Sequence, residues 1–314
     1  MALRRKIRNS LKRSAVRIFH LGQKCGVDIT PRHFYSSTPD LKSLRSSNSW
    51  KERRSMAGVA GTGIEAQVEF LCACCPDAAR AQASIADLVA YGTHENGVVG
   101  YGPVESAVLY CFISTLKPKR VIQVGAGYST AIILRAAKES GYAVDLTCVD
   151  PFPTDYLRRL SRAASIKLLA EPAQDVAIDI LTDLQAGDLF FLDSTHTVKV
   201  GSEVNRIVLE VFPRLPKGCF VQVHDIYFPY DYHRGVFTDT YFPGQSTLVH
   251  AYLTDNRRCG IKVALGMLHY ARPDELRRLF PEYSPGGNDA GLRAPPKGHF
   301  PSALYLQMTG DPLA

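Results

Sequence analysis

Four side chains that can move protons or bind metal ions follow two apolar runs in the second half of the chain. The run DLFFL leads directly into Asp193, with His196 three residues later, and the run CFVQV leads into His224 and Asp225. Apolar runs of this length are typical of strands buried in a parallel sheet. Because such sheets bind ligands beyond the carboxyl ends of their strands, we expect the four side chains to share one cleft.

The chemistry of this group is open between two roles. An imidazole can accept a proton from a hydroxyl, which makes His196 or His224 a candidate general base, with Asp225 as a third catalytic candidate. Two carboxylates at the ends of adjacent strands can instead bind Mg²⁺ or another divalent cation, and Asp193 and Asp225 are then the ligands. A simpler interpretation is that His224 only hydrogen-bonds the backbone of a turn.

A glycine turn, Gly125-Ala126-Gly127, joins the run VIQV to a segment with a helical pattern. Glycine lets the backbone approach a ligand closely, and the start of a helix offers free N–H groups. Asp150 follows the next predicted strand, 23 residues after Gly127, where a carboxylate can bind both hydroxyls of a ribose. Thr130 replaces the third glycine of the dinucleotide pattern. The local alternatives are a tight turn at the glycines and helix caps at Asp150 and Asp193.

A sheet must position these residues, and from residue 120 onward the pattern alternates strands with helices. This alternation predicts an α/β fold with a doubly wound, mostly parallel sheet. The predicted strands are 121–124, 144–149, 166–170, 188–193, 219–223, 261–267 and 303–307. The predicted helices are 129–140, 176–184, 198–212 and 247–254, preceded by 63–90 and 104–116.

Charge and composition divide the chain into three predicted parts. Residues 1–26 form a basic amphipathic helix, 27–62 an extended linker, and 63–314 a domain whose core is about 95–270. The chain has 37 basic and 30 acidic side chains, and eight of the basic ones but no acid lie in residues 1–25. The near-neutral remainder argues against a nucleic-acid partner. The basic helix either contacts an anionic membrane surface or packs on the domain.

The cysteines indicate the expected cellular compartment, and two further segments are predicted to be loops. Most of the 8 cysteines lie in apolar or helical segments, and their spacing is not that of a zinc site. We therefore expect reduced thiols and a cytoplasmic protein. A second expectation is that this cytoplasmic protein contacts the inner membrane surface peripherally. The aromatic segment 227–241 either covers a substrate pocket, packs as a surface loop, or forms a homodimer contact. The Pro/Gly-rich stretch 284–298 is predicted to be a surface loop.

Four motifs in order resemble those of class I S-adenosylmethionine-dependent methyltransferases, in the small-molecule group often labelled family 24. They are VIQVGAGYST, CVDPFP, LFFLDSTHT and GCFVQVHDIYFPYDY. The resemblance implies a seven-stranded Rossmann-like sheet with an antiparallel final strand. It also implies that Gly125, Gly127, Tyr128 and Ser129 bind the methionine end of the cofactor, that Asp150 binds its ribose, and that Asp193 faces the sulfonium. Gln123 stands where many members have an acid, and its amide can still hydrogen-bond the cofactor.

The function implied is methyl transfer from S-adenosylmethionine to a small-molecule or glycan acceptor, with a hydroxyl oxygen as the expected site. Two alternatives remain open. One is a non-catalytic module that binds a membrane or a partner through its basic N-terminus, motivated by the uncharged Gln123. The other is a metal-dependent hydroxylase-like relative on the same fold.

Overall fold

The computed structural model describes residues 2–96, 100–164, 166–233, 235–238, 240–284 and 300–313. The chain separates into two units, Met1–Trp50 and Lys51–Ala314, and each is described by itself. The predicted loop 284–298 lies almost wholly outside the described residues. None of the helices within the described ranges combines the length and the hydropathy that crossing a bilayer requires.

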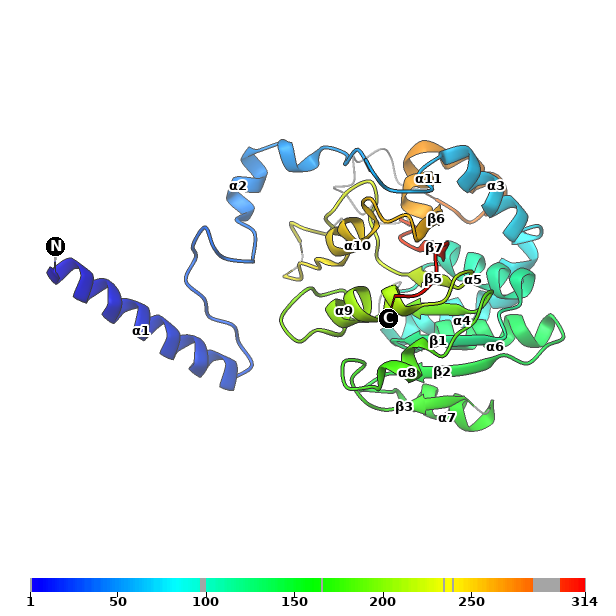
Figure 1. The fold of residues 1–314 in the computed structure, drawn as a ribbon, viewed down its shortest axis with the longest axis horizontal. Coiled ribbons are helices and arrows are strands. Elements are labelled where there is room, and N and C mark those ends of the chain that lie inside the picture. Colours follow the sequence, from blue (N-terminus) through cyan, green and yellow to red (C-terminus); the bar gives the residue numbers. More distant parts are fainter. Residues whose placement is uncertain are drawn as a thin grey trace. The chain divides into compact units, whose positions relative to one another are not determined.

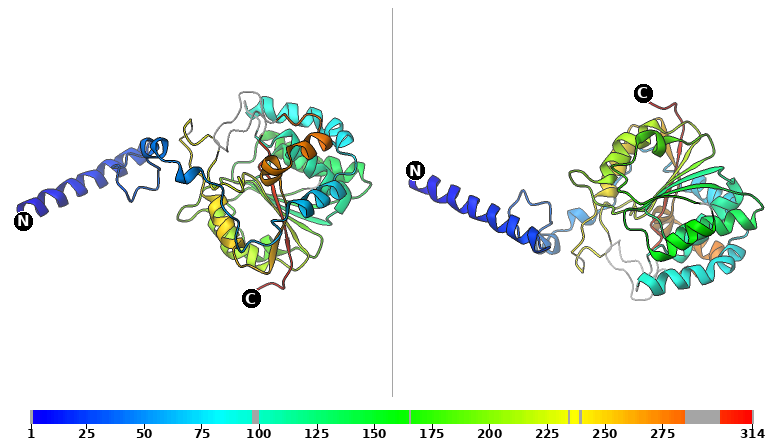
Figure 2. Two further views of the ribbon diagram at one scale, coloured as in Figure 1. Left: turned by 90° about the horizontal axis from the view of Figure 1, so that it is seen from above. Right: turned by 90° about the horizontal axis from the view of Figure 1, so that it is seen from below.

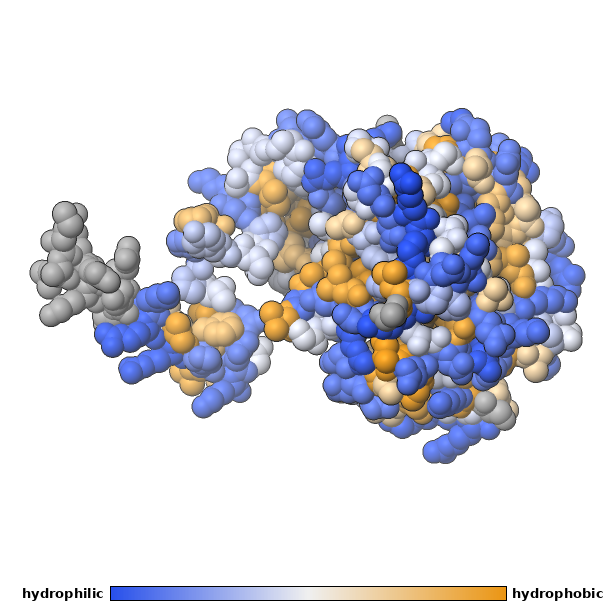
Figure 3. Space-filling model, in the orientation of Figure 1, coloured by the Kyte–Doolittle hydropathy of each residue, from blue (hydrophilic) through white to orange (hydrophobic). Residues whose placement is uncertain are grey.

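The first unit contains helix α1 (Ala2–Lys24) and the short helix α2 (Leu41–Ser46). Both hydrophilic and hydrophobic side chains are visible on the described part of α1 (Figure 3). The extended conformation predicted for 27–62 is interrupted by α2 and by a 3₁₀ turn, Ser49–Lys51. Helix α2 begins where it does because the carboxylate of Asp40 accepts hydrogen bonds from the N–H groups of Lys42 and Ser43.

The second unit is built on one seven-stranded sheet with the order β3-β2-β1-β4-β5-β7-β6 (Figure 1). Neighbours from β3 to β5 are parallel, whereas β7 is antiparallel to both β5 and β6. The α/β, doubly wound and mostly parallel sheet is therefore confirmed, as is the antiparallel final strand. The strands are β1 (Arg120–Val124), β2 (Asp145–Val149), β3 (Lys167–Leu169), β4 (Leu189–Leu192), β5 (Phe220–Val223), β6 (Cys259–Ala264) and β7 (Leu304–Met308).

Helices cover both faces of this sheet (Figure 2). One apolar core lies between the sheet and α3 (Ile64–Cys74), α4 (Ala78–Asn96), α5 (Pro103–Leu116) and α6 (Tyr128–Glu139). A second core lies under α8 (Ile178–Thr182), α9 (Glu203–Arg206) with its π-helical continuation Ile207–Val211, and α10 (Gln245–Leu253). Successive strand residues alternate between the two cores, as Phe190 and Phe191 do, because strand side chains point to opposite faces.

Several predicted element boundaries are wrong. The helix predicted over 63–90 is two helices, interrupted at Pro76, which cannot donate a backbone hydrogen bond. The helix predicted from 198 begins only at Glu203, where the Ser202 side chain caps it. The strand predicted over 261–267 ends at Ala264, and α11 (Leu265–Ala271) and α12 (Pro273–Leu279) follow. Helix α7 (Asp155–Ala163) lies between β2 and β3 without a sequence prediction.

Candidate active site

The turn after β1 requires glycine at one position and leaves room at the other. Gly125 has φ +78°, and a Cβ there would lie 1.7 Å from the carbonyl oxygen of Asp193. No side chain fits this backbone contact. Gly127 has φ −170°, and a Cβ there would meet no protein atom within 4 Å. The first glycine therefore serves the fold, while the second leaves open space where a ligand can approach the start of α6.

Asp150, at the end of β2, lies directly against this turn. Its Oδ2 accepts a hydrogen bond from the N–H of Ala126 at 3.1 Å, and its Oδ1 accepts one from the N–H of Phe152 at 2.8 Å. A carboxylate has about four acceptor positions, so two remain for a ribose diol. The helix-cap alternative does not hold, because Thr154 caps α7.

Gln123 does not lie where a cofactor could contact it. Its side chain is fully buried beneath α6, where the amide donates to the Ser129 hydroxyl at 2.9 Å and accepts from the Thr130 hydroxyl at 2.9 Å. The predicted contact between Gln123 and the cofactor is corrected accordingly: the amide fixes the first turn of α6. An uncharged amide suits this place, because it can be both donor and acceptor while a carboxylate can only accept.

A cavity of about 880 Å³ opens between the glycine turn and the ends of β4 and β5. This volume is within the usual range for small-molecule sites, about 300–1,000 Å³. Every predicted site residue except Gln123 lines it: Gly125, Gly127, Tyr128, Ser129, Asp150, Asp193, His196, His224 and Asp225. Its walls also include residues that the sequence did not single out, among them Tyr91, Tyr101, Tyr156 and Arg159.

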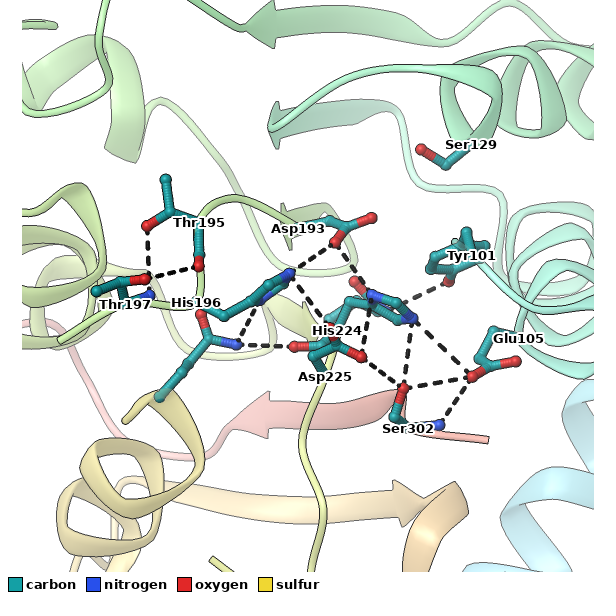
Figure 4. A network of polar contacts seen from close by, with 12 residues as sticks. Tyr101, Glu105, Ser129, Asp193, Thr195, His196, Thr197, His224, Asp225 and Ser302 are labelled. Carbon is teal, nitrogen blue, oxygen red and sulfur yellow. Dashed lines mark hydrogen bonds and ion pairs between the residues drawn. The ribbon is translucent and has the colours of Figure 1, made fainter. Parts of the chain in front are cut away.

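The two aspartates and two histidines form one polar cluster at the β4–β5 end of this cavity (Figure 4). Asp193 Oδ1 lies 3.0 Å from His224 Nδ1 and 3.4 Å from His196 Nε2. Asp225 Oδ2 lies 3.5 Å from His196 Nε2. The helix-cap alternative for Asp193 is excluded, since Ser202 caps α9. His196 and Asp225 both have left-handed backbone, with φ 57° and 56°, which turns their side chains back toward the strand ends.

His224 is enclosed on both ring nitrogens. Nδ1 faces Asp193, and Nε2 lies 3.9 Å from Glu105 Oε1 and 3.5 Å from the Ser302 hydroxyl. Burial alone lowers the pKa of His224, but the charges of Asp193 and Asp225 outweigh it and raise the pKa to about 10. The same pairing lowers the pKa of Asp193 despite its burial. An imidazole held protonated in this way is a poor general base, which argues against that role for His224.

Glu105 is the functional residue that sequence reasoning missed most clearly. It is 1% exposed on α5, and its Oε1 accepts the backbone N–H of Ser302 at 2.8 Å. A signal was present in the sequence. Glu105 is the one charged residue in a helix that is mostly apolar, and a buried carboxylate needs a partner.

The Nδ1 atom of His196, on the side of the ring away from the two aspartates, contacts Gln245. Gln245 Nε2, at the start of α10, lies 3.2 Å from His196 Nδ1 and donates to the carbonyl oxygen of His224 at 2.7 Å. One amide thus ties together the loops that follow β4 and β5. The Nε2 of His196 faces Asp193 and Asp225, on the cavity side of the cluster.

Part of this chain is similar to known proteins. Residues 122–226 match a family model described as a methyltransferase domain. An uncharacterized protein of Archaeoglobus fulgidus is 25% identical over 179 residues, which are 52% of this chain and 76% of that protein.

Two solved structures are also similar to this chain. The S-adenosylhomocysteine-bound Podospora anserina methyltransferase PaMTH1 is 14% identical, with a TM-score of 0.38 and coverage of 66% of this chain and 78% of its own. The Burkholderia thailandensis 1,6-didemethyltoxoflavin-N1-methyltransferase is 15% identical, with a TM-score of 0.36 and coverage of 73% and 87%. The match over residues 122–226 thus places a methyltransferase-like domain on β1, β2, β3, β4 and β5 of the sheet described above.

Proposed function

We propose that this protein transfers the methyl group of S-adenosylmethionine to a hydroxyl oxygen of a small molecule or glycan. The observation that carries the proposal is the cavity, which has the glycine turn and Asp150 at one end and the aspartate–histidine cluster at the other. A nucleoside-containing donor and an acceptor with an ionisable proton would occupy these two ends.

The cofactor end has the features that an adenosyl ligand requires. The open space at Gly127 admits close approach of the ligand to the backbone, and Asp150 has two acceptor positions free for the ribose hydroxyls. Tyr128 and Ser129 border the same space. S-adenosylmethionine supplies a methyl group that its sulfonium charge already activates, so the protein chiefly has to align the acceptor with it.

The acceptor end favours oxygen as the methylated atom. A hydroxyl must lose its proton as it takes the methyl group, and Asp193, His196 and Asp225 place groups that can accept a proton at that end of the cavity. Asp193 also belongs to the loop that contacts Gly125, so its carboxylate lies beside the turn expected to hold the methionine part.

The uncharged Gln123, which motivated the non-catalytic alternative, has another explanation. The uncharged side chain of Gln123 has a structural reason, its paired hydrogen bonds to Ser129 and Thr130, and does not count against cofactor binding.

Calorimetric titration with S-adenosylhomocysteine tests the proposal. Asp150→Ala should weaken binding at least tenfold, because a hydrogen bond to a charged group contributes about 1.5–3 kcal/mol. Asp145→Ala is the matched control, since it removes an exposed carboxylate from the other end of the same strand, and it should bind as the wild type does. Failure of the wild-type protein to bind either the cofactor or its product would overturn the assignment. With binding in place, methyl transfer from labelled cofactor to hydroxyl-bearing compounds, and its absence with their O-methylated forms, tests the acceptor atom.

A further inference from the structure

We propose that the N-terminal unit, Met1–Trp50, docks on an anionic membrane surface through an apolar stripe of α1 and an aromatic turn in the segment that follows it. The sequence left membrane contact as one of two alternatives for the basic helix, and the exposed side chains of this unit favour it. The inference concerns a surface outside the cavity, so it goes beyond the proposed function and does not depend on it.

Exposed apolar side chains are concentrated in this unit. Of the thirteen large hydrophobic side chains that are exposed in the described part of the chain, eight lie within residues 11–35. Single exposed apolar side chains are ordinary on a protein surface, whereas a group of neighbours marks a surface that binds something apolar. The segment 11–35 therefore contains the strongest candidate for such a surface among the described residues.

Helical geometry gathers part of this group into one stripe on α1. Leu11, Ile18 and Leu21 lie seven and three residues apart, which places them on the same side of the helix, and each is at least half exposed. Leu3 and Ile7 precede them at helical spacing in the sequence. Such a stripe is the part of an interfacial helix that lies among the lipid acyl chains.

The chain that follows α1 extends this stripe. Gly26 has φ +74°, and Val27 donates its N–H to the carbonyl oxygen of Gly22 at 2.9 Å, so the chain turns back at the end of the helix. A Cβ at Gly22 would lie 3.2 Å from Cγ1 of Ile29, so Ile29 packs on the helix there. Gly22 follows Ile18 by four residues and therefore lies on the stripe side. Val27 and Ile29, both exposed, thus enlarge the apolar surface at this end of α1.

Two aromatic rings are exposed at the corner of a turn in the same unit. The Ser36 N–H donates to the His33 carbonyl oxygen at 2.8 Å, and the His33 N–H donates to the Ser36 hydroxyl at 3.0 Å, which closes the turn. Phe34 and Tyr35 occupy its two corner positions, where glycine, proline, asparagine or aspartate is usual, and they are 80% and 83% exposed. Tyrosine is enriched at membrane–water interfaces, and phenylalanine is typical of the lipid-facing side of interfacial segments.

The charge of α1 favours an anionic surface over a second copy of this chain. Residues 1–25 hold eight basic side chains and no acid. Arg13 and Arg17 lie beside the stripe, four residues apart, and like charges at this spacing destabilise a helix in water. Two copies of α1 packed along their stripes would bring these charges together, whereas anionic headgroups would neutralise them. Long basic side chains can also reach the headgroups while the stripe lies deeper.

Co-sedimentation of the full-length protein with vesicles tests the docking. The vesicles are phosphatidylcholine alone, or with about one third phosphatidylglycerol, in about 0.1 M salt, where the Debye length is about 10 Å. We expect the wild type to bind the anionic vesicles and not the neutral ones. The stripe variant, Leu11→Gln with Ile18→Gln, keeps every charge and should bind at least about tenfold more weakly. Val16→Gln is the matched control, because Val16 is an exposed apolar residue of the same helix on the side away from the stripe, and it should bind as the wild type does.

Two further variants test the charges and the turn. The charge variant, Arg13→Gln with Arg17→Gln, should bind about 25-fold more weakly, since each basic side chain near an anionic surface contributes about fivefold. The turn variant, Phe34→Ser with Tyr35→Ser, should bind at least about fivefold more weakly. All of these side chains are exposed, so urea unfolding should be unchanged and a loss of binding does not reflect misfolding.

The possible results separate a membrane from other occupants. If the stripe variant binds like the wild type and only the charge variant fails, α1 recognises polyanions such as nucleic acid by charge alone, and the membrane docking is overturned. A wild type that is dimeric without vesicles and a stripe variant that is monomeric would also overturn it, because a second copy would then cover the stripe. Wild-type binding in the turn variant would refute the part assigned to Phe34 and Tyr35. Wild-type protein that binds neither kind of vesicle, or both equally, would refute the whole inference.

Discussion

The two glycines of the turn after β1 should respond differently to the same substitution. In Gly127→Ala the new methyl group enters open space, so the cost is limited to the poorer N-cap that alanine makes at the start of α6. That cost, partly offset by the lower entropy of the unfolded chain, gives a loss of no more than about 1 kcal/mol in the free energy of unfolding. The methyl group occupies the space assigned to the cofactor, and overpacking of about 1–3 kcal/mol corresponds to about 5- to 150-fold weaker binding.

Gly125→Ala should instead destabilise the fold. Left-handed backbone costs an L-residue about 1–2 kcal/mol. The new Cβ would also lie 1.7 Å from the Asp193 carbonyl oxygen, a backbone atom that cannot rotate away. With about 1–3 kcal/mol for the forced shift, the loss is about 2–5 kcal/mol.

Urea unfolding and calorimetry with S-adenosylhomocysteine measure both effects. Gly141→Ala is the control, since Gly141 has φ +73° but open space around its Cβ and lies away from the cavity. It should lose about 1–2 kcal/mol and keep wild-type affinity. Wild-type affinity in Gly127→Ala would refute the reasoning, because the cofactor would then not pass over Gly127.

Three further predictions concern other parts of the chain. Deletion of residues 1–25 should reduce co-sedimentation with anionic vesicles at low salt at least tenfold and leave neutral vesicles unaffected, and unchanged partitioning would show that α1 is not the contact. The Tyr110 hydroxyl donates a hydrogen bond to the Glu139 carboxylate at 2.6 Å, and this bond is the main reason why the pKa of Glu139 lies below its usual 4.5. The bond therefore stabilises the fold fully above pH 4.5, and its contribution is lost as the pH falls through the lowered pKa of Glu139. Tyr110→Phe should therefore cost about 1 kcal/mol at pH 7 and less in acid, and an equal cost at both, measured by urea unfolding, would contradict the assignment. Asp188 is buried, and its carboxylate accepts a hydrogen bond from the N–H of Arg120 at 2.9 Å. Asp188→Ala should therefore lower the free energy of unfolding, measured with urea, by about 1–3 kcal/mol. A loss below about 0.5 kcal/mol, the usual effect of a surface substitution, would contradict a stabilising role for this hydrogen bond.

The parts of the fold that the sequence predicts are those with local patterns. The strands at 121–124 and 188–193 are apolar runs between turns, and the glycine turn with Asp150 is a spacing within one β-α-β unit. Helix α7 went unpredicted although it has a short helical pattern, in which Leu157 and Leu160 lie three residues apart among charged side chains. The Thr154 side chain caps its start by accepting the N–H of Leu157, and a pattern of only nine residues is easily overlooked in a sequence.

The candidate site is predicted only as far as the strand ends. Gln123 is an example of a residue beyond that limit. It lies on the same face of β1 as Val121, and Val121 packs in the core that contains α6. Strand alternation therefore points Gln123 under the helix, whereas family resemblance points it at the cofactor. Glu105 and Ser302 reach the cluster from helix α5 and from the approach to β7, 197 residues apart, and only tertiary packing brings them together.

The two ends of the cavity are held by the same strand ends, and this fixes the distance between them. Gly125 donates its N–H to Val149 on β2 at 3.0 Å, and Asp193 donates to Val124 on β1 at 2.9 Å. The contact between Gly125 and the Asp193 carbonyl closes the arrangement. A ligand at the glycine turn and a group at Asp193 are thus positioned by sheet hydrogen bonds rather than by mobile loops, which is the rigidity that alignment of a methyl donor with its acceptor requires. Any side chain at position 125 must move Asp193, so damage to the cofactor turn reaches the acceptor end as well.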